Sequence, residues 1–186
     1  MEKQINIYNL KIYYETSCRN IKHPRLEFKT GKLLLVLPKN YKKENELINR
    51  HKNWIYEKSL IIELAKKDAE KKIVNPKEDK ELKNFVYYLI EKYSKETGTL
   101  PEQVHFRELK SKWGSCGSKR LTFNTLLKYL PENLIKYIVF HEIVHLKEKN
   151  HNDEFQKIIS RKFKNYRENE KELLTYWFLI QDLTGK

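Results

Sequence analysis

The sequence predicts a mixed α+β fold, on three observations. Strand-forming residues fill the first forty positions and recur in the middle of the chain. Around these runs, apolar residues recur at helical spacing. The chain has 186 residues, of which 39% are hydrophobic. A chain of this length and composition can bury a core, so a folded protein is expected rather than a disordered one.

The N-terminal part is expected to be a small sheet. Residues 5–14 are rich in strand formers, and residues 33–37 form a continuous apolar run. The Thr30-Gly31 pair lies between this run and the apolar residues of 26–28. Glycine readily adopts the positive φ that tight turns need, so this pair predicts a hairpin turn.

Two helices joined by a linker are expected next. Apolar residues recur at a mostly helical spacing over residues 42–67, which predicts one long helix. The stretch 68–79 is highly charged and is the best candidate for a hinge or linker. A second helical pattern covers residues 80–97 and stops at Gly98, which suits a helix C-terminus.

The second half is expected to combine two strands with three helices. Residues 104–113 and 120–124 have strand character, and the glycine-containing stretch 114–118 between them is typical of a turn. Proline is favoured in the first turn of a helix. Helices are therefore expected from Pro131 to about Lys147, over residues 153–163 and over residues 168–183.

The charge balance raises the possibility of a polyanionic partner. Lys and Arg number 38 and Asp and Glu 25, giving a net charge of +13. This excess is compatible with nucleic-acid binding. Only seven of the 38 are Arg, the residue best suited to bidentate phosphate and base recognition. We therefore expect a lysine-rich solvated surface and keep nucleic-acid binding as the alternative.

Neither a membrane partner nor a disulfide framework is expected. The longest apolar runs, Leu33–Leu37 and Tyr176–Ile180, are far shorter than the roughly 20 residues of a membrane span. The first residues do not have the pattern of a signal peptide. Two cysteines, Cys18 and Cys116, are too few for a disulfide scaffold. A cytoplasmic location is the simplest expectation.

The motif that carries chemistry is His141-Glu142-Ile143-Val144-His145. Four residues advance a helix by about 400°, so the two histidines point the same way, one turn apart. Two imidazole nitrogens can then meet one metal ion. Glu142 lies on the adjacent edge of that face, where it can hold a water molecule and accept its proton.

A third histidine completes the ligand set expected for catalytic zinc. His151 follows His145 by six residues. If the helix ends near Lys149 and Asn150 turns the chain in the left-handed conformation that Asn tolerates, His151 can reach the same metal. The two helical histidines continue an apolar stripe, and burying imidazoles beside a carboxylate is costly without a partner such as a metal. We therefore expect a Zn²⁺ site on His141, His145 and His151, with Glu142 as general base.

The surroundings of this motif carry a family resemblance. The motif differs from that of the metzincins, because Glu148 stands where they have glycine and the only methionine, Met1, cannot form their Met-turn. The residues that carry the resemblance are Leu109–Cys116, Asn124, Tyr137–Leu146, Asn150, His151 and Phe155. Together they resemble the YgjP-like metallopeptidase family, which is related to the WLM and SprT-like zincins. One departure from that pattern is Gln156, where tryptophan is common.

The resemblance implies a zincin-like catalytic domain with a small sheet and an active-site helix, preceded by a strand-rich segment. We expect one domain over residues 1–186, in which residues 1–75 hold the N-terminal strands and long helix and residues 76–186 hold the catalytic core. The implied function is a zinc metallopeptidase that cleaves a protein or peptide substrate. The alternative is a nucleic-acid-associated basic protein whose zinc site is structural or acts on DNA-bound proteins.

Residues just before the motif are candidates for substrate binding. Trp113 is expected first of all to be a core aromatic. The functional alternative is that its strand lines the cleft, in which case Trp113, Gly114 and Ser115 contact an extended peptide. Cys116 is expected to be a small residue tolerated in a tight turn, with metal ligation as the alternative. Asn124 is expected either to form hydrogen bonds near the site or to end a strand.

Overall fold

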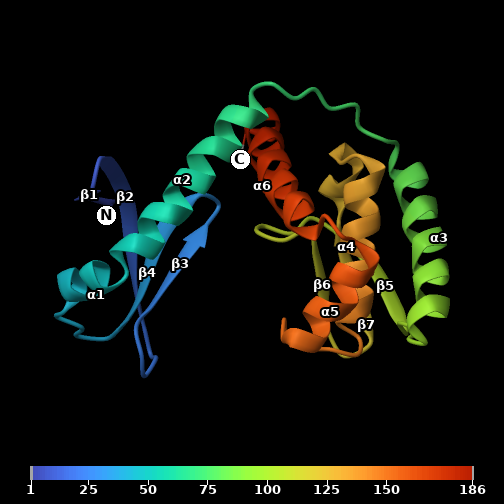
Figure 1. The fold of residues 1–186 in the computed structure, drawn as a ribbon, viewed down its shortest axis with the longest axis horizontal. Helices are drawn as coiled ribbons and strands as arrows, with labels where there is room; N and C mark the ends of the chain where they lie inside the picture. Colours follow the sequence, from blue (N-terminus) through green and yellow to red (C-terminus); the bar gives the residue numbers. More distant parts are fainter. Residues whose placement is uncertain (1, 186) are drawn as a thin grey trace. The chain divides into compact units, whose positions relative to one another are not determined.

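The computed structural model describes residues 2–185 and divides the chain into two compact units, Met1–Asp68 and Ala69–Lys186 (Figure 1). Each unit combines a small sheet with helices, which confirms the α+β class. That the two units act as one domain stays a prediction. Within the described residues, every helix is too short or too polar to cross a bilayer.

The first unit is built on a four-stranded sheet. Its strands are β1 (Lys3–Ile7), β2 (Leu10–Arg19), β3 (Arg25–Lys29) and β4 (Lys32–Pro38), in the order β1-β2-β4-β3. The β2 and β4 strands are parallel, and the two outer pairs are antiparallel. The predicted hairpin joins β3 to β4, and both of its turn residues have positive φ, as a type I′ turn requires.

The helical part of the first unit corrects one expectation. The predicted single helix is two helices, α1 (Glu44–Arg50) and α2 (Lys52–Ala69). They are separated at His51, where the backbone leaves the helical region. Leu47 before the break and Ile55 after it belong to the same core against the sheet. The apolar spacing continues across the break, so this pattern alone did not reveal that the segment forms two helices.

The second unit contains a three-stranded sheet with β7 (Arg120–Asn124) in the middle. It pairs in parallel with β5 (Gln103–Arg107) and antiparallel with β6 (Gly114–Cys116). Two expectations were wrong here: the strand starting near residue 104 ends at Arg107, and the stretch expected to be a turn contains β6. A three-residue strand is too short to show alternation, and glycine usually indicates a turn.

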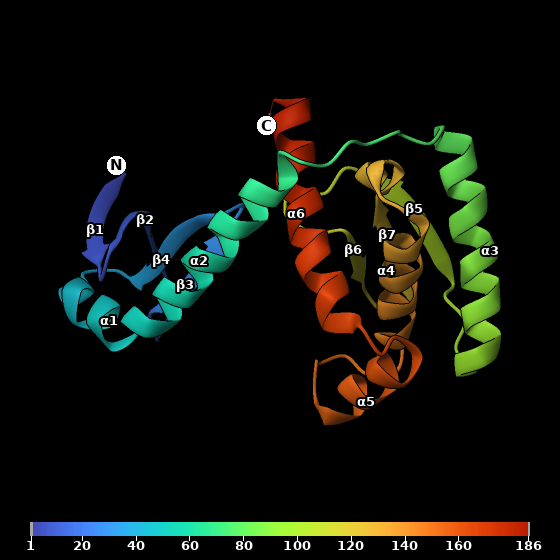
Figure 2. The same ribbon diagram turned by 45° about the horizontal axis from the view of Figure 1, so that its top comes forward.

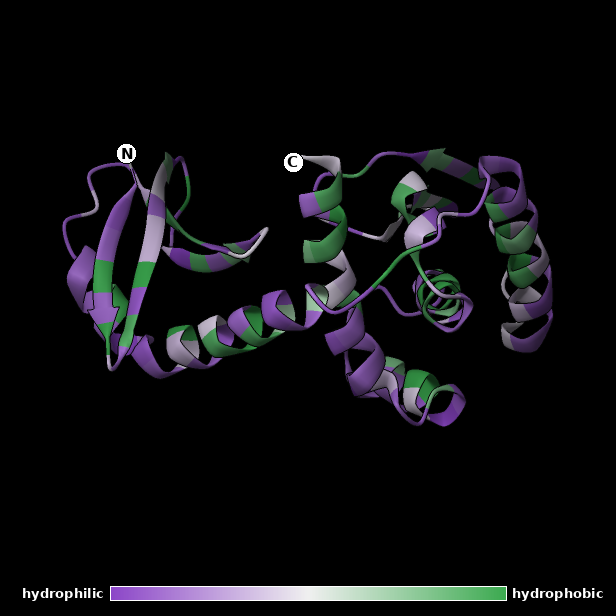
Figure 3. Cartoon of the chain, turned by 90° about the horizontal axis from the view of Figure 1, so that it is seen from above, coloured by the Kyte–Doolittle hydropathy of each residue, from purple (hydrophilic) through white to green (hydrophobic). Residues whose placement is uncertain are grey.

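One helix lies at the centre of the second unit. This helix, α4 (Glu132–Val144), packs against β6 and against α3 (Asp79–Thr97), α5 (Asp153–Lys162) and α6 (Tyr166–Thr184) (Figure 2). A short 3₁₀ helix, η1 (Thr125–Tyr129), lies between β7 and α4 in the chain. Figure 3 shows α4 almost end-on, with hydrophobic residues around its circumference. A helix with apolar residues on most of its sides is largely buried, and in α4 the exposed residues are Glu132 and Asn133 of the first turn.

The end of α4 differs from its expected position. The helix ends at Val144 rather than near Lys147, and hydrogen-bonded turns carry the chain onwards. Asn150 does not adopt the left-handed conformation; the non-glycine residues with positive φ lie elsewhere in the described chain. The chain therefore reverses through successive tight turns and not through one left-handed residue.

Asn124 fastens the loop that precedes β6. Its side chain is fully buried and donates hydrogen bonds to the carbonyls of Leu109 and Lys112, at 2.9 and 2.8 Å. Its side-chain oxygen accepts a hydrogen bond from the backbone N–H of Leu126 at 3.1 Å. Asn124 thus both ends a strand and holds residues 109–112 in place beside it.

Replacing Asn124 with alanine is expected to destabilise the protein by about 2–4 kcal/mol, because it leaves one buried N–H and two part-buried carbonyls without their hydrogen-bond partner. Urea unfolding followed by tryptophan fluorescence measures the change. The matched control is Asn133→Ala at an exposed position, which is expected to change stability by less than about 0.5 kcal/mol. Equal unfolding midpoints for the two variants would contradict the role given to Asn124.

Candidate active site

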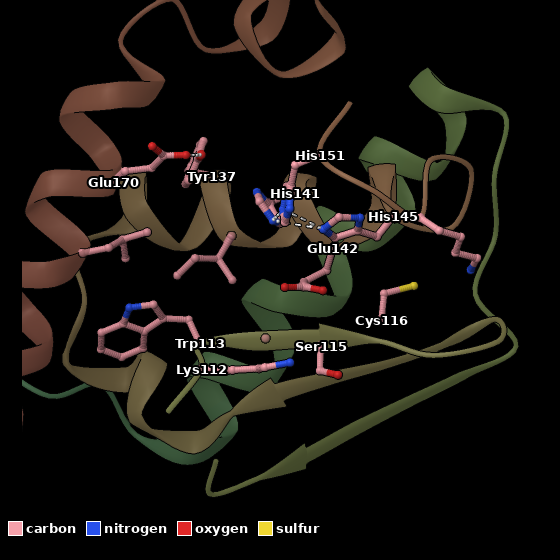
Figure 4. A pocket seen from close by; sticks show the side chains of 14 residues that line it. Lys112, Trp113, Ser115, Cys116, Tyr137, His141, Glu142, His145, His151 and Glu170 are labelled. Atoms are coloured by element: carbon pink, nitrogen blue, oxygen red, sulfur yellow. Dashed lines mark hydrogen bonds between the residues drawn. The ribbon is translucent and has the colours of Figure 1, made fainter. Parts of the chain in front are cut away.

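Three histidine rings meet at the end of α4. The Nε2 atom of His145 lies 3.2 Å from that of His141 and 3.1 Å from that of His151, and the third separation is 3.1 Å (Figure 4). The structure thus brings together all three residues that the sequence predicted as ligands. Among the described residues, this is the one group of His, Cys, Asp and Glu side chains close enough to share a metal ion.

The local fold explains why the rings converge. His141 lies in the last turn of α4 and His145 at its C-cap, so both project from the same face. His151 comes just before α5, whose N-cap Asn152 accepts a hydrogen bond from the N–H of Phe155 at 2.9 Å. The Phe155 ring is buried against all three imidazoles, with centroid separations of 4.6–4.9 Å.

Phe155 is a positioning residue that the spacing of the histidines in the sequence did not indicate. Its ring stacks on His145 and meets the other two rings edge-on. The sequence marked Phe155 only through the family resemblance, because one aromatic residue on an amphipathic helix is normally part of the core. Its contacts with all three rings make it the apolar support of the histidine cluster.

Hydrogen bonding fixes the tautomer of one ring. Nδ1 of His145 lies 2.8 Å from the carbonyl oxygen of Glu148. A carbonyl can only accept, so Nδ1 carries the proton and the Nε2 lone pair faces the other rings. Such a partner on the outer nitrogen is typical of a metal-binding histidine. Nδ1 of His141 is buried and has no hydrogen-bond partner among residues 2–185.

The surroundings of His141 and His145 favour the neutral form of these two rings. Burial, and then the neighbouring His145 and His151, lower the pKa of His141 to about 3. Burial also lowers the pKa of His145, against the opposing effect of its hydrogen bond to Glu148. Neutral imidazole is the form that binds a metal ion. These two rings are therefore ready to bind a metal at physiological pH.

The geometry fits a tetrahedral zinc ion. Ligand nitrogens about 2.0–2.1 Å from a tetrahedral centre lie about 3.3 Å from one another. The observed separations of 3.1–3.2 Å are close to this value. Three imidazoles suit zinc better than the hard cations Ca²⁺ and Mg²⁺, which prefer oxygen ligands. Three protein ligands also leave a fourth position for water or substrate.

Glu142 lies beside the histidines in a tight apolar environment. Its side chain is only 7% exposed and packs on Gly114 of β6. Burial raises its pKa to about 7, and the positive charge of Lys112 acts in the opposite direction. A Cβ atom at position 114 would lie 2.7 Å from both Cγ and Oε1 of Glu142. The absence of a side chain at position 114 is therefore what makes room for this carboxylate.

A cavity of about 470 Å³ opens onto these groups, and its wall includes all three predicted substrate-binding residues, Trp113, Gly114 and Ser115. Trp113 is half-buried and meets Trp177 edge-on, with ring centroids 5.0 Å apart. It lies in the loop before β6 rather than in a strand, which corrects that expectation. Trp113 is thus both a core aromatic and part of the cavity wall.

Cys116 also borders the cavity but lies outside the group of ligand atoms. Its thiol donates to the carbonyl of Gly117 at 3.3 Å, and burial raises the pKa of the thiol. Cys116 belongs to β6 and not to the tight turn expected for it. Its place in the structure does not support metal ligation by the thiolate.

The comparison with protein families agrees with the sequence resemblance. The profile of the YgjP-like metallopeptidase domain matches residues 63–176, which is more than half of the chain. The crystal structure of the metallopeptidase zymogen of Pyrococcus abyssi abylysin is 26% identical, with a TM-score of 0.45; the match covers 48% of this chain and 92% of that one. The search of curated proteins gave no match. On the extent of the domain match, this chain belongs to the YgjP-like metallopeptidase family.

Proposed function

We propose that this metallopeptidase-family protein is a zinc-dependent peptidase, with His141, His145 and His151 as ligands and Glu142 as general base. The observation that carries the proposal is the convergence of three Nε2 atoms within 3.1–3.2 Å of one another. Three imidazole nitrogens have little reason to crowd together in a partly buried site unless a cation lies between them. The family match supports a peptide bond as the target.

In this proposal Glu142 moves the proton. A bound zinc ion would polarise the substrate carbonyl and favour ionisation of water. Glu142 accepts a proton from the attacking water and later donates it to the leaving amine. A pKa of about 7 suits both steps, because the carboxyl is then available in either protonation state near neutral pH. The contact with Gly114 fixes the carboxylate in one position.

The neighbouring strand offers a place for an extended substrate. Among the described strands, β6 pairs with β7 alone, so its other edge has free backbone groups. An extended peptide can add to such an edge through main-chain hydrogen bonds. We propose that Trp113, Gly114 and Ser115, which line the cavity at this point, contact a protein or peptide substrate there.

A purely structural zinc site is the less favoured reading. Such sites are closed by four protein ligands. Only three candidate ligands gather here within the described residues, and a cavity opens directly onto them. Both observations support catalysis.

The metal is tested by plasma mass spectrometry on untagged protein. Wild type is expected to hold about one zinc ion per chain, as one set of three ligands requires, and His151→Ala is expected to lose most of it. His105→Ala is the matched control, because His105 is exposed on β5 and lies outside the ligand group. Wild-type protein that stays free of metal after incubation with zinc would overturn the proposal.

The role of Glu142 is tested with Glu142→Gln. This change preserves shape but removes the proton acceptor, so peptide cleavage is expected to fall by about 10²–10⁴-fold or more. Zinc content is expected to stay at the wild-type level, because Glu142 is not a ligand. Full activity in this variant would exclude Glu142 as the base. Binding to nucleic acid, if found, should survive the change and weaken steeply with salt.

The contact between Glu142 and Gly114 makes a separate prediction. Gly114→Ala would displace the carboxylate, and a shift of about 1 Å can cost about 10²-fold in rate. We expect that loss in kcat/KM at unchanged zinc content. Gly117→Ala is the control, since a Cβ there meets nothing closer than the Arg120 carbonyl at 3.9 Å. Equal activity in the two variants would show that position 114 does not hold the base in place.

A further inference from the structure

One end of the cavity carries an acidic group that the proposed chemistry does not use. Glu170 on α6 and Tyr137 on α4 both line the cavity. Figure 4 shows the two side chains pointing towards each other, on the side of His141 away from His145. Tyr137 precedes His141 by one helical turn, and the two rings are 5.9 Å apart between centroids. The acidic group is therefore near the place where a bond would be cleaved.

The Glu170 carboxylate is held in place but has no counter-ion. The hydroxyl of Tyr137, a residue that is only 2% exposed, donates to Oε1 of Glu170 at 3.1 Å. Burial, and then the Glu170 charge, raise the pKa of Tyr137, so the phenol stays a donor. Among residues 2–185, Glu170 forms no ion pair, whereas Glu172 on the same helix binds Lys72 at 2.8 Å. An oriented, unpaired carboxylate in a cavity wall is suited to a cation from outside.

The cavity wall that holds Glu170 also carries apolar side chains. Trp113, Ile138 and Leu173 line the cavity, and Trp113 packs edge-on against Trp177. Lysine and arginine combine an aliphatic stem with a charged head, so they can cover an apolar wall and place the charge at its end. Neutral polar or acidic side chains lack one or both of these parts.

The lysines of the cavity and its other carboxyl group lie apart from Glu170. Lys112 and Lys149 also line it, and both lie close enough to His145 to lower its pKa. In Figure 4, Lys112 lies near Ser115, across the cavity from the histidine cluster, and away from Glu170. Glu142, the other carboxyl group of the wall, is buried beside the histidines. A cationic side chain is therefore repelled by the lysines, and Glu170 is the exposed carboxylate of the wall that attracts it.

We propose that Glu170, oriented by Tyr137, is a specificity-determining residue that selects peptides with lysine or arginine next to the cleaved bond. The inference rests on the proposed peptidase function. It adds a substrate class, a basic peptide, to a site whose chemistry is set by other residues. Removal of one hydrogen-bonded charge pair corresponds to about a 10–100-fold change in the ratio of kcat/KM values.

The test compares peptides that differ only in lysine, norleucine or glutamate at the positions flanking the cleaved bond. Wild type is expected to cleave the lysine peptide with a kcat/KM about 10–100-fold above that of the norleucine peptide. Glu170→Gln should bring that ratio close to one, and Glu170→Lys should favour the glutamate peptide. Glu168→Gln is the control, since it removes the same charge from α6 at an exposed residue outside the cavity wall. It should keep the wild-type ratio.

The outcomes separate the two proposals. Cleavage without a preference for lysine, or a preference that persists in Glu170→Gln, would overturn the role of Glu170 and leave the peptidase function intact. Cleavage of no peptide by zinc-loaded wild type would overturn the peptidase function, and the specificity proposal with it. If the ratio of kcat/KM for the lysine and norleucine peptides changes equally in Glu168→Gln and Glu170→Gln, the preference comes from the overall charge of the surface. That outcome would also overturn the proposal.

Discussion

The second unit depends on the packing of α4, which is both the centre of its core and the support of its candidate metal centre. Leu134, Ile135, Val139 and Ile143 are completely buried, and the helix packs against β6, α3, α5 and α6. A helix held in this way cannot rotate without breaking the core. The histidines of its last turn are therefore oriented by the surrounding packing, before any metal binds. Rigid support of this kind is what a precise ligand geometry needs.

The contact between β6 and α4 connects the sheet to the proposed chemistry. Gly114 lets the strand approach the helix so closely that the Glu142 side chain occupies the space of a missing Cβ. Asn124 holds the loop that leads into this strand through hydrogen bonds to two of its backbone carbonyls. The position of the proposed base is thus set by a residue without a side chain and by a hydrogen-bonded asparagine ten positions later. Asn124 lies outside the cavity wall, yet it acts on the position of the base through the loop and strand that it holds.

More of the candidate site than of the fold could be predicted from the sequence. His141 and His145 lie one helical turn apart, so local geometry alone brings them together, and His151 is close enough in sequence to join them. The start of α3 and its end at Gly98 followed from helical periodicity and a glycine stop signal. The β6 strand could not be predicted, because its three residues gain strand structure only from pairing with β7. Glu170 was missed because its position near the site arises from tertiary packing of α6, to which no local pattern corresponds.

One physical cause, burial, prepares both kinds of group in the site. Desolvation disfavours a charge of either sign, so it lowers the pKa of His141 and raises that of Glu142. The first effect keeps an imidazole lone pair free for a cation, and the second gives a carboxyl group that gains and loses a proton near neutral pH. Glu170 differs from Glu142 because it is exposed, and its orientation comes from a hydrogen bond with Tyr137 rather than from desolvation. Two carboxyl groups in one cavity are thus suited to different tasks, proton transfer for the buried one and attraction of a cation for the exposed one.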